Sequence, residues 1–287
     1  MSDITRTEGA PTAPTDYKTI LVHVDGAAGA SGRIALAVEL ARRHGAHLIG
    51  AAFTGLSRFV YHDASVDLAR TVLAPYMDGL YRKAESELDQ FTRAAAALPS
   101  CEARLVDDEA GAGLVLAARY ADLVVLGQRE PGTPAAAAGD LVAQVLLACA
   151  RPLLVVPYAG AGAASGRRVL AGWNGSVEAV RAMTAALPLL RRADHVTVAM
   201  VGPVAAGGPS ADADLAAWLG RHGIAAANVR ASADHEAGAG LLSLVADLGA
   251  DLLVMGAYGH ARLRELVLGG ATRTVLQAMT VPVLVAH

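Results

Sequence analysis

An internal repeat constrains the fold of this chain more than any other feature of its sequence. The motif Asp-x-Glu-Ala-Gly-Ala-Gly-Leu occurs at 107–114 and again at 234–241. An apolar run that begins Ala-Asp-Leu and ends in glycine follows each copy, at 121–127 and at 250–256. Such self-similarity indicates two copies of one domain. The length of 287 residues agrees with that reading, because domains usually hold about 100–200 residues.

Apolar runs of strand length also open and close each copy. The opening runs lie at 18–25 and 168–174, and the closing runs follow a proline at 151–156 and 281–285. Runs rich in Val and Leu without polar alternation are typical of parallel sheets covered by helices on both faces. In the second copy we expect strands near 168–174, 195–202, 227–232, 251–256 and 282–286, and helices near 176–190, 210–222, 236–248 and 270–279.

The first copy is the longer of the two. Asp25 and Asn174 are 149 residues apart, whereas Gly127 and Gly256 are only 129 apart, so the additional residues lie between these points in the first copy. They fall within 61–91, where apolar residues recur at helical spacing. The pattern predicts either a longer helix or an added one.

Composition shifts suggest the domain boundaries. We expect 1–16 to be a disordered leader, because it is rich in Thr, Pro and Ala and lacks the apolar region of a signal peptide. The first domain is then 17–158 and the second 167–287. Between them, 159–166 contains only small residues and is expected to be a flexible linker.

The composition excludes several classes of protein. A net charge of −3 does not favour nucleic-acid binding, and 54% hydrophobic residues exclude disorder of the whole chain. The most apolar stretch, 141–158, is interrupted by Gln144 and Arg151, so no membrane span is expected. Two cysteines, Cys101 and Cys149, make neither a disulfide framework nor a metal cluster. We expect a cytoplasmic protein.

The repeated motif itself has a structural interpretation. Its glycines lie near the start of the predicted third helix of each copy, where tight packing would require them. Asp107 and Asp234 precede these helices and are expected to act as N-caps.

The end of the fourth strand in the second copy carries the clearest functional pattern. Ligands of open parallel sheets bind at the carboxyl ends of the strands, where the strand order reverses. Here Gly256, Gly259 and Gly269 frame a loop that leads into a helix. Glycines let backbone N–H groups approach a phosphate chain, and the helix N-terminus adds donors and a positive dipole. Cationic residues lie in the same stretch: His260, Arg262, Arg264 and Arg273.

This stretch resembles the nucleotide-binding pattern of the universal stress protein family. That pattern reads Gly, two residues, Gly, nine residues, then Gly followed by Ser or Thr. Gly256, Gly259 and Gly269 match its spacing. Gly270 stands at the Ser/Thr position and is a departure, although Thr272 lies two residues further on.

The resemblance covers both copies, roughly 17–157 and 167–287, so the chain looks like a tandem universal stress protein. It implies an α/β fold of two doubly wound, five-stranded parallel-sheet domains of the adenine nucleotide alpha hydrolase-like type. The implied strand order is 3-2-1-4-5 in each. Single-domain members pair through their last strands, which implies an internal pseudo-dimer here. Assembly of two chains into a homodimer stays open.

The resemblance also implies an adenine pocket in the second copy. The family's Asp at the end of strand one corresponds to Asn174, and its apolar residue at the end of strand two corresponds to Val201. An amide can still hydrogen-bond a base, but it lacks the charge. The alternative is that Asn174 only makes a turn, with Ser176 as helix N-cap. The predicted binding residues are Gly172, Asn174, Val201, Met255, Gly256, Gly259, His260, Gly269, Gly270, Ala271 and Thr272.

The first copy departs further from the family pattern. Gly127 is kept and Gly139 can be aligned, but Glu130 stands at the position of Gly259, in a loop with two prolines. A carboxylate repels phosphate, and prolines lack N–H donors. Asp25 remains after the first strand. We interpret the first copy as a degenerate site; the alternative is a site for another ligand.

No catalytic residue can be assigned, because the chain contains no P-loop motif and no Ser/His/Asp or paired-carboxylate pattern. The resemblance therefore implies a stress-response protein that binds ATP with Mg²⁺ and signals to an unidentified protein partner as its conformation changes. Two alternatives are a slow ATP-hydrolysing enzyme and a nucleotide-free scaffold.

Overall fold

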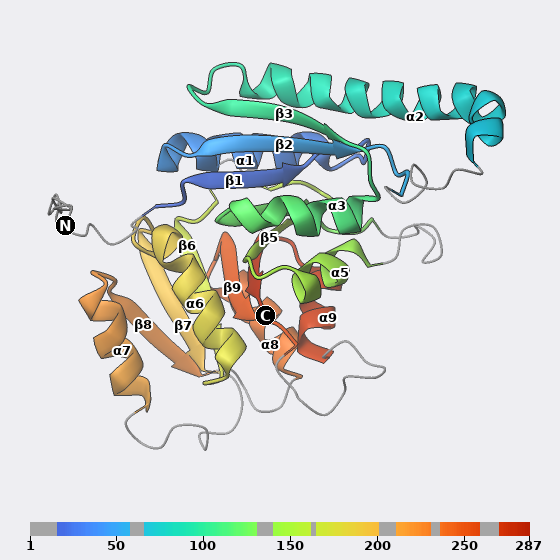
Figure 1. Ribbon diagram of the computed structural model, residues 1–287. Helices are drawn as coiled ribbons and strands as arrows, with labels where there is room; N and C mark the ends of the chain where they lie inside the picture. The colour runs from blue at the N-terminus through green and yellow to red at the C-terminus, as the bar shows by residue number, and fades with distance from the viewer. Residues whose placement is uncertain are drawn as a thin grey trace, which may run out of the picture.

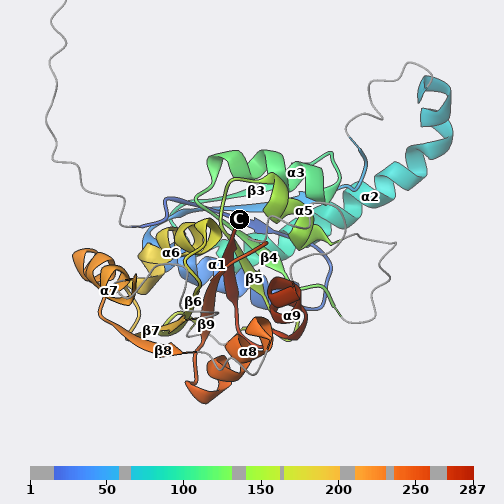
Figure 2. The ribbon, with the colours of Figure 1, turned by 90° about the horizontal axis from the view of Figure 1, so that it is seen from below.

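The computed structural model describes residues 16–57, 66–130, 140–161, 165–200, 211–230, 236–258 and 270–287. These residues form one ten-stranded sheet with helices on both faces (Figure 1). In Figure 2 the first domain is coloured blue to green and the second yellow to red. Within the described segments, no helix combines the length and the apolar character that crossing a membrane requires.

The first domain alternates strands and helices along the chain. Its elements are β1 (Thr19–His23), α1 (Ala30–His44), β2 (His47–Phe53), α2 (Val66–Ala95), β3 (Cys101–Val106), α3 (Ala110–Ala117), the 3₁₀ helix η2 (Ala118–Tyr120), β4 (Leu123–Gly127), α5 (Leu141–Ala148) and β5 (Leu153–Val156).

The second domain repeats this order. Its elements are β6 (Arg168–Trp173), α6 (Val177–Leu190), β7 (His195–Met200), α7 (Ala211–Arg221), β8 (Ala226–Arg230), α8 (Ala237–Asp247), β9 (Leu252–Gly256), α9 (Gly270–Ala278) and β10 (Val283–Ala286). Every strand and helix predicted for the second copy is therefore present near its expected place.

The strand order is β3-β2-β1-β4-β5-β10-β9-β6-β7-β8, so each domain has the predicted order 3-2-1-4-5. Neighbouring strands within each domain are parallel. The two domains meet where β5 pairs antiparallel with β10, with Leu154 opposite Leu284. The expected internal pseudo-dimer is thereby confirmed as a single continuous sheet.

Apolar side chains form one core on each face of the sheet. Helices α1, α2, α6 and α7 cover one face, with buried residues such as Ile34, Phe91, Met183 and Leu219. Helices α3, α5, α8 and α9 cover the other, with Leu114, Val145, Leu241 and Val275. Strands β4, β5, β9 and β10 are buried along nearly their whole length, which explains their uninterrupted apolar sequences.

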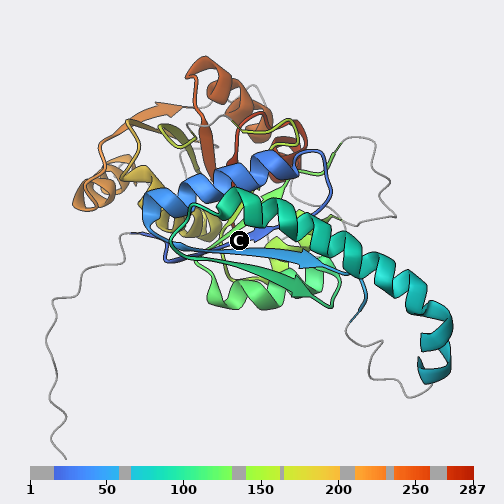
Figure 3. The ribbon, with the colours of Figure 1, turned by 90° about the horizontal axis from the view of Figure 1, so that it is seen from above.

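The additional residues of the first copy extend one helix. Helix α2 has 30 residues, whereas α7 at the matching place in the second domain has 11. Ala84, Leu88 and Phe91 anchor the C-terminal half of α2 on the sheet. Its N-terminal half extends past the sheet (Figures 1 and 3). The longer helix is therefore the correct one of the two predicted possibilities.

The glycines of the repeated motif allow close helix packing, as predicted. A Cβ at Gly111 would overlap the Gln144 side chain of α5, and a Cβ at Gly238 would lie 2.7 Å from the Ala271 carbonyl oxygen of α9. The predicted N-cap role of Asp107 is wrong. Helix α3 begins at Ala110 with Glu109 as its N-cap residue, so Asp107 lies too far upstream to bond its first turn. Asp234 is outside the described residues.

The aspartate of the repeated Ala-Asp-Leu segment has a role that the sequence did not reveal. Asp122 accepts hydrogen bonds from the backbone N–H groups of Lys18 and Thr19 at 2.7 and 3.0 Å. Asp251 accepts three such bonds, from residues 166–168, at 2.8–3.1 Å. Each aspartate thus fixes the start of its domain's first strand beside the fourth.

Side chains on both faces also join the two domains. Gln128 donates to the carbonyl oxygens of Leu276 and Gln277 near the end of α9, at 2.9 and 3.1 Å. On the opposite face the Tyr17 hydroxyl donates to the Ala185 carbonyl oxygen of α6 at 2.7 Å. Residues 1–15 of the predicted leader and 162–164 of the predicted linker are outside the described segments.

Candidate functional site

The strand order places the candidate site of the second domain between β6 and β9. From β6 the sheet continues to β7 and β8 on one side and to β9 and β10 on the other. The crossover helices therefore leave in opposite directions at this point, and it is here, at the carboxyl ends of the two strands, that open parallel sheets have their ligand crevice.

The end of β6 forms the tight turn that was the alternative for Asn174. The Asn174 side-chain oxygen accepts the backbone N–H of Ser176 at 3.1 Å. Ser176 is the N-cap of α6 and accepts the N–H of Ala179 at 3.2 Å, while Gly175 supplies a positive φ of 73°. Asn174 is exposed. Its oxygen is engaged, so the amide nitrogen is the part that can face a ligand.

The end of β9 lies directly against the start of α6. A Cβ at Gly256 would lie 2.5 Å from the Ala179 nitrogen and 2.6 Å from the Glu178 carbonyl carbon. Only glycine allows this approach. The N-terminus of α6, with its positive dipole end, is thereby held at the carboxyl end of β9.

Gly172 and Met255 pack toward the face of the sheet that α8 covers, opposite the face that α6 covers. A Cβ at Gly172 would lie 3.2 Å from the Leu241 side chain of α8 and 3.8 Å from the Cβ of Met255. Met255 is buried in the core beneath α8. These two predicted residues lie together, but they pack under α8 and not beside the N-terminus of α6.

The start of α9 lies beside the end of the β9 segment. The Tyr258 backbone N–H donates to the Thr272 hydroxyl oxygen at 3.3 Å, so both ends of the 259–269 connection are close together. Tyr258 has a positive φ of 60°, and burial raises the pKa of its hydroxyl to about 12, aided by the charge of Asp140. Gly270 is exposed at the first position of α9, whereas Thr272 is buried.

Four of the predicted binding residues lie outside the described part of the chain: Val201, Gly259, His260 and Gly269. The described residues nevertheless fix the surroundings of the glycine loop. Helices α6 and α9 both begin at the edge of the sheet where β6 and β9 end. Two helix N-termini at one edge favour an anionic ligand.

The corresponding edge of the first domain is occupied by charged side chains. Asp25 accepts the N–H of Ala27 at 3.0 Å, the same turn that Asn174 makes. It also pairs with the Arg33 guanidinium at 2.6 Å. Glu130 accepts the N–H of Ala28 at 3.0 Å, just ahead of α1. The carboxylate that replaces Gly259 thus takes up a backbone donor.

Burial and charge act in opposite directions on these groups. Burial by itself raises the pKa of Asp25, but the Arg33 guanidinium, with a further effect of the His23 ring and the hydrogen bonds that Asp25 accepts, holds that pKa below its usual value. Burial lowers the pKa of His23 to about 4, against the effect of Asp25. His23 is therefore neutral near pH 7, and the full charges of the pair are those of Asp25 and Arg33.

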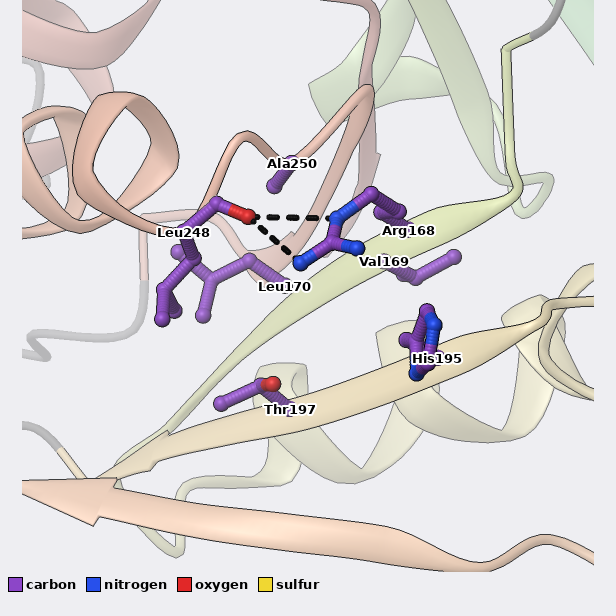
Figure 4. A pocket seen from close by; sticks show the side chains of 7 residues that line it. All are labelled: Arg168, Val169, Leu170, His195, Thr197, Leu248 and Ala250. Carbon is purple, nitrogen blue, oxygen red and sulfur yellow. Dashed lines mark hydrogen bonds between the residues drawn. The ribbon is translucent and has the colours of Figure 1, made fainter.

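A small cleft elsewhere in the second domain is separate from this site (Figure 4). Arg168 and His195, which line it, are the first residues of β6 and β7, so the cleft lies at the amino ends of the strands. The Arg168 guanidinium donates to the Leu248 carbonyl oxygen at 3.2 and 3.0 Å. No cluster of three His, Cys, Asp or Glu side chains suited to a metal occurs among the residues that the structure describes.

The fold defines a class: a duplicated, doubly wound α/β protein with one strand-order switch point in each domain. The sequence profile of the universal stress protein family matches residues 16–157 and 166–287. The chain therefore belongs to the universal stress protein family.

Solved structures show the same tandem fold. A universal stress protein from Archaeoglobus fulgidus DSM 4304 aligns with a TM-score of 0.67 at 17% identity, over 93% of this chain and 97% of that one. A functionally unknown protein from Pseudomonas aeruginosa PAO1 aligns with a TM-score of 0.55 at 16% identity, over 95% of this chain and 93% of that one. No curated protein sequence matches this chain.

Sequence reasoning missed one residue of the first domain's edge, Arg33. A signal for it was present, because Arg33 lies beside Ile34 and four residues before Ala37 on the buried side of α1. An arginine among buried apolar positions requires a partner.

Proposed function

We propose that the second domain binds ATP with Mg²⁺ at the carboxyl ends of β6 and β9, and that the protein acts in a stress response. The bound nucleotide selects the conformation that a protein partner recognises. The observation that carries this proposal is the Gly256, Gly259 and Gly269 spacing, which begins at the last residue of β9, at the switch point of a universal stress protein domain.

The phosphate chain is assigned to the glycine loop and the start of α9. The bond between Tyr258 and Thr272 supports this assignment, because it keeps the loop ends near the α9 N-terminus. The Thr272 hydroxyl accepts this bond through its oxygen and can donate its proton to a phosphate oxygen. We assign the phosphates to Gly256, Gly259, His260, Gly269, Gly270, Ala271 and Thr272.

The adenosine end is assigned to the opposite side of the crevice. We place the base or ribose against Asn174 and Val201, above the layer formed by Gly172 and Met255. Mg²⁺ commonly binds through substrate phosphates and water with few protein ligands, which is the chemistry it would have here. No residue of the chain is assigned a catalytic role.

Thermal unfolding with and without ATP and Mg²⁺ tests the proposal. A ligand at about 100 times its dissociation constant adds about 2.7 kcal/mol to the folded state, which raises Tm by roughly 5–10 °C for a domain of this size. Guanine nucleotides at the same concentration serve as the comparison. The proposal fails if ATP, ADP, AMP and cyclic AMP all leave Tm unchanged.

Asn174→Asp should sharpen the preference for adenine over guanine. A carboxylate can keep the turn with one oxygen, as Asp25 does with Ala27, and its second oxygen can accept from the adenine amino group or a ribose hydroxyl, where the amide nitrogen of Asn174 can only donate. The expected gain is about 1–2 kcal/mol, or roughly 5–30-fold in the ratio of the two affinities. Titration with ATP and GTP measures it, and equal affinities for both nucleotides in wild type and variant would exclude Asn174 from the pocket.

A further inference from the structure

Arg33 is a buried cation at the ligand edge of the first domain. It lies on α1 with only 2% of its surface exposed, among the apolar residues that pack on the sheet. Arginine is almost never buried to this extent unless its guanidinium is paired and hydrogen-bonded. The groups around Arg33 must therefore supply that pairing.

The guanidinium is held by the end of β1. Its Nη2 donates to Asp25 Oδ1 at 2.6 Å, and its Nε donates to the carbonyl oxygen of His23 at 2.8 Å. The second oxygen of Asp25 lies 3.4 Å from His23 Nδ1. A charge-assisted bond together with a backbone acceptor fixes the plane of the guanidinium.

The end of β4 provides the other wall. A Cβ at Gly127 would overlap Nη1 of Arg33. The guanidinium therefore lies against the final residue of β4 while it bonds the end of β1. Strands β1 and β4 are the neighbours at which the strand order reverses in this domain. Arg33 thus fills the crevice in which such sheets bind their ligands.

Both members of the Asp25–Arg33 pair are replaced by uncharged residues at the corresponding positions of the second domain. At the 149-residue offset between Asp25 and Asn174, Arg33 corresponds to Ala182, which is buried on α6. The domain with the arginine has the aspartate, and the domain without it has the neutral amide. This paired difference is expected if Asp25 serves to bind a cation.

We propose that the first domain carries its own ligand: the Arg33 guanidinium occupies a guanidinium-binding site formed by Asp25, the His23 carbonyl and Gly127, and closes the switch-point crevice to any external molecule. The site would accept a planar cation of this class if Arg33 were removed. Together with Glu130, it would also oppose nucleotide binding in the first domain.

Arg33→Ala tests the site by rescue with the free ion. The variant should lose about 5–10 °C in Tm, because Asp25 is left without its partner. Guanidinium chloride titrated up to tens of millimolar should then raise its Tm relative to equal NaCl, by about 2–4 °C at about five times the dissociation constant that the titration gives. Urea, which is planar but neutral, should not. Wild type and Arg42→Ala, which removes an exposed ion pair of the same helix, should gain nothing from guanidinium.

Gly127→Ala tests the same geometry with Arg33 in place. The added methyl group should displace the guanidinium and lower Tm by about 4–8 °C. Gly79→Ala is the matched control, since a Cβ there meets no atom within 4 Å and the residue lies in a helix. In an Arg33→Ala background the cost of Gly127→Ala should largely disappear.

Three outcomes would overturn the inference: Arg33→Ala with no response to guanidinium beyond that to NaCl, Gly127→Ala as stable as wild type, or additive losses in the double variant. If Arg33→Ala does not fold, the comparison of Gly127→Ala with wild type still decides. None of these measurements uses a nucleotide. Their failure would therefore leave the proposed function of the second domain unaffected.

Discussion

Gly259→Glu is expected to abolish the thermal shift that ATP gives the wild-type protein, whereas Glu130→Ala should leave that shift intact. A carboxylate about 4 Å from a phosphate oxygen costs ~1 kcal/mol in bulk water and ~4 kcal/mol at an effective dielectric of about 20. The added side chain would also prevent the close backbone approach to a phosphate that glycine permits. Together they should weaken binding by roughly a hundredfold or more.

The first domain shows what such a carboxylate does at this edge. Glu130 accepts the N–H of Ala28 and so removes a donor ahead of α1. The measurement is Tm at saturating ATP and Mg²⁺ for wild type and the two variants. If Gly259→Glu keeps the wild-type shift, the phosphates do not bind at the glycine loop. If Glu130→Ala loses the shift, the nucleotide binds in the first domain.

Gly256→Ala is expected to lower the free energy of unfolding by about 1–3 kcal/mol. Its Cβ would lie 2.5 Å from the Ala179 nitrogen, and backbone atoms of a packed helix cannot move aside as a flexible side chain can. Displacing the start of α6 from β9 should also reduce the ATP-dependent shift, because that helix end faces the crevice.

Gly270→Ala is the matched control at the other end of the same loop. A Cβ at Gly270 meets no atom within 4 Å, and alanine favours the helix over glycine by about 1 kcal/mol in a helix interior and less at its first position. Urea unfolding of both variants measures the difference. If Gly256→Ala unfolds at the same urea concentration as Gly270→Ala, the close approach of α6 to β9 is not present in solution.

Much of the fold was predictable because its signals are local or repeated. The uninterrupted apolar runs at 121–127 and 250–256 are buried strands, and the extra residues of the first copy fall in α2. The antiparallel pairing of β5 with β10 could not be predicted in this way, because nothing in residues 153–156 or 283–286 specifies a partner strand. That expectation came from the family resemblance.

The surroundings of the site were less predictable, because they depend on contacts between distant residues. The turn at Asn174 follows from its neighbours and was foreseen as an alternative. The Tyr258 to Thr272 bond and the contact of Arg33 with Gly127 join residues far apart in the chain. The N-cap prediction for Asp107 was wrong for a local reason: a favourable residue type does not by itself determine where a helix begins.

Titration calorimetry with ATP and Mg²⁺ tests the central claim most directly, because it counts the sites. The two domains share a fold. Only the second has a glycine, Gly259, where the first has Glu130, and in the first domain Arg33 fills the crevice. The account predicts one ATP per chain for wild type and for Glu130→Ala, and none for Gly259→Glu. Two equivalent sites per chain, or one site that survives Gly259→Glu, would contradict it.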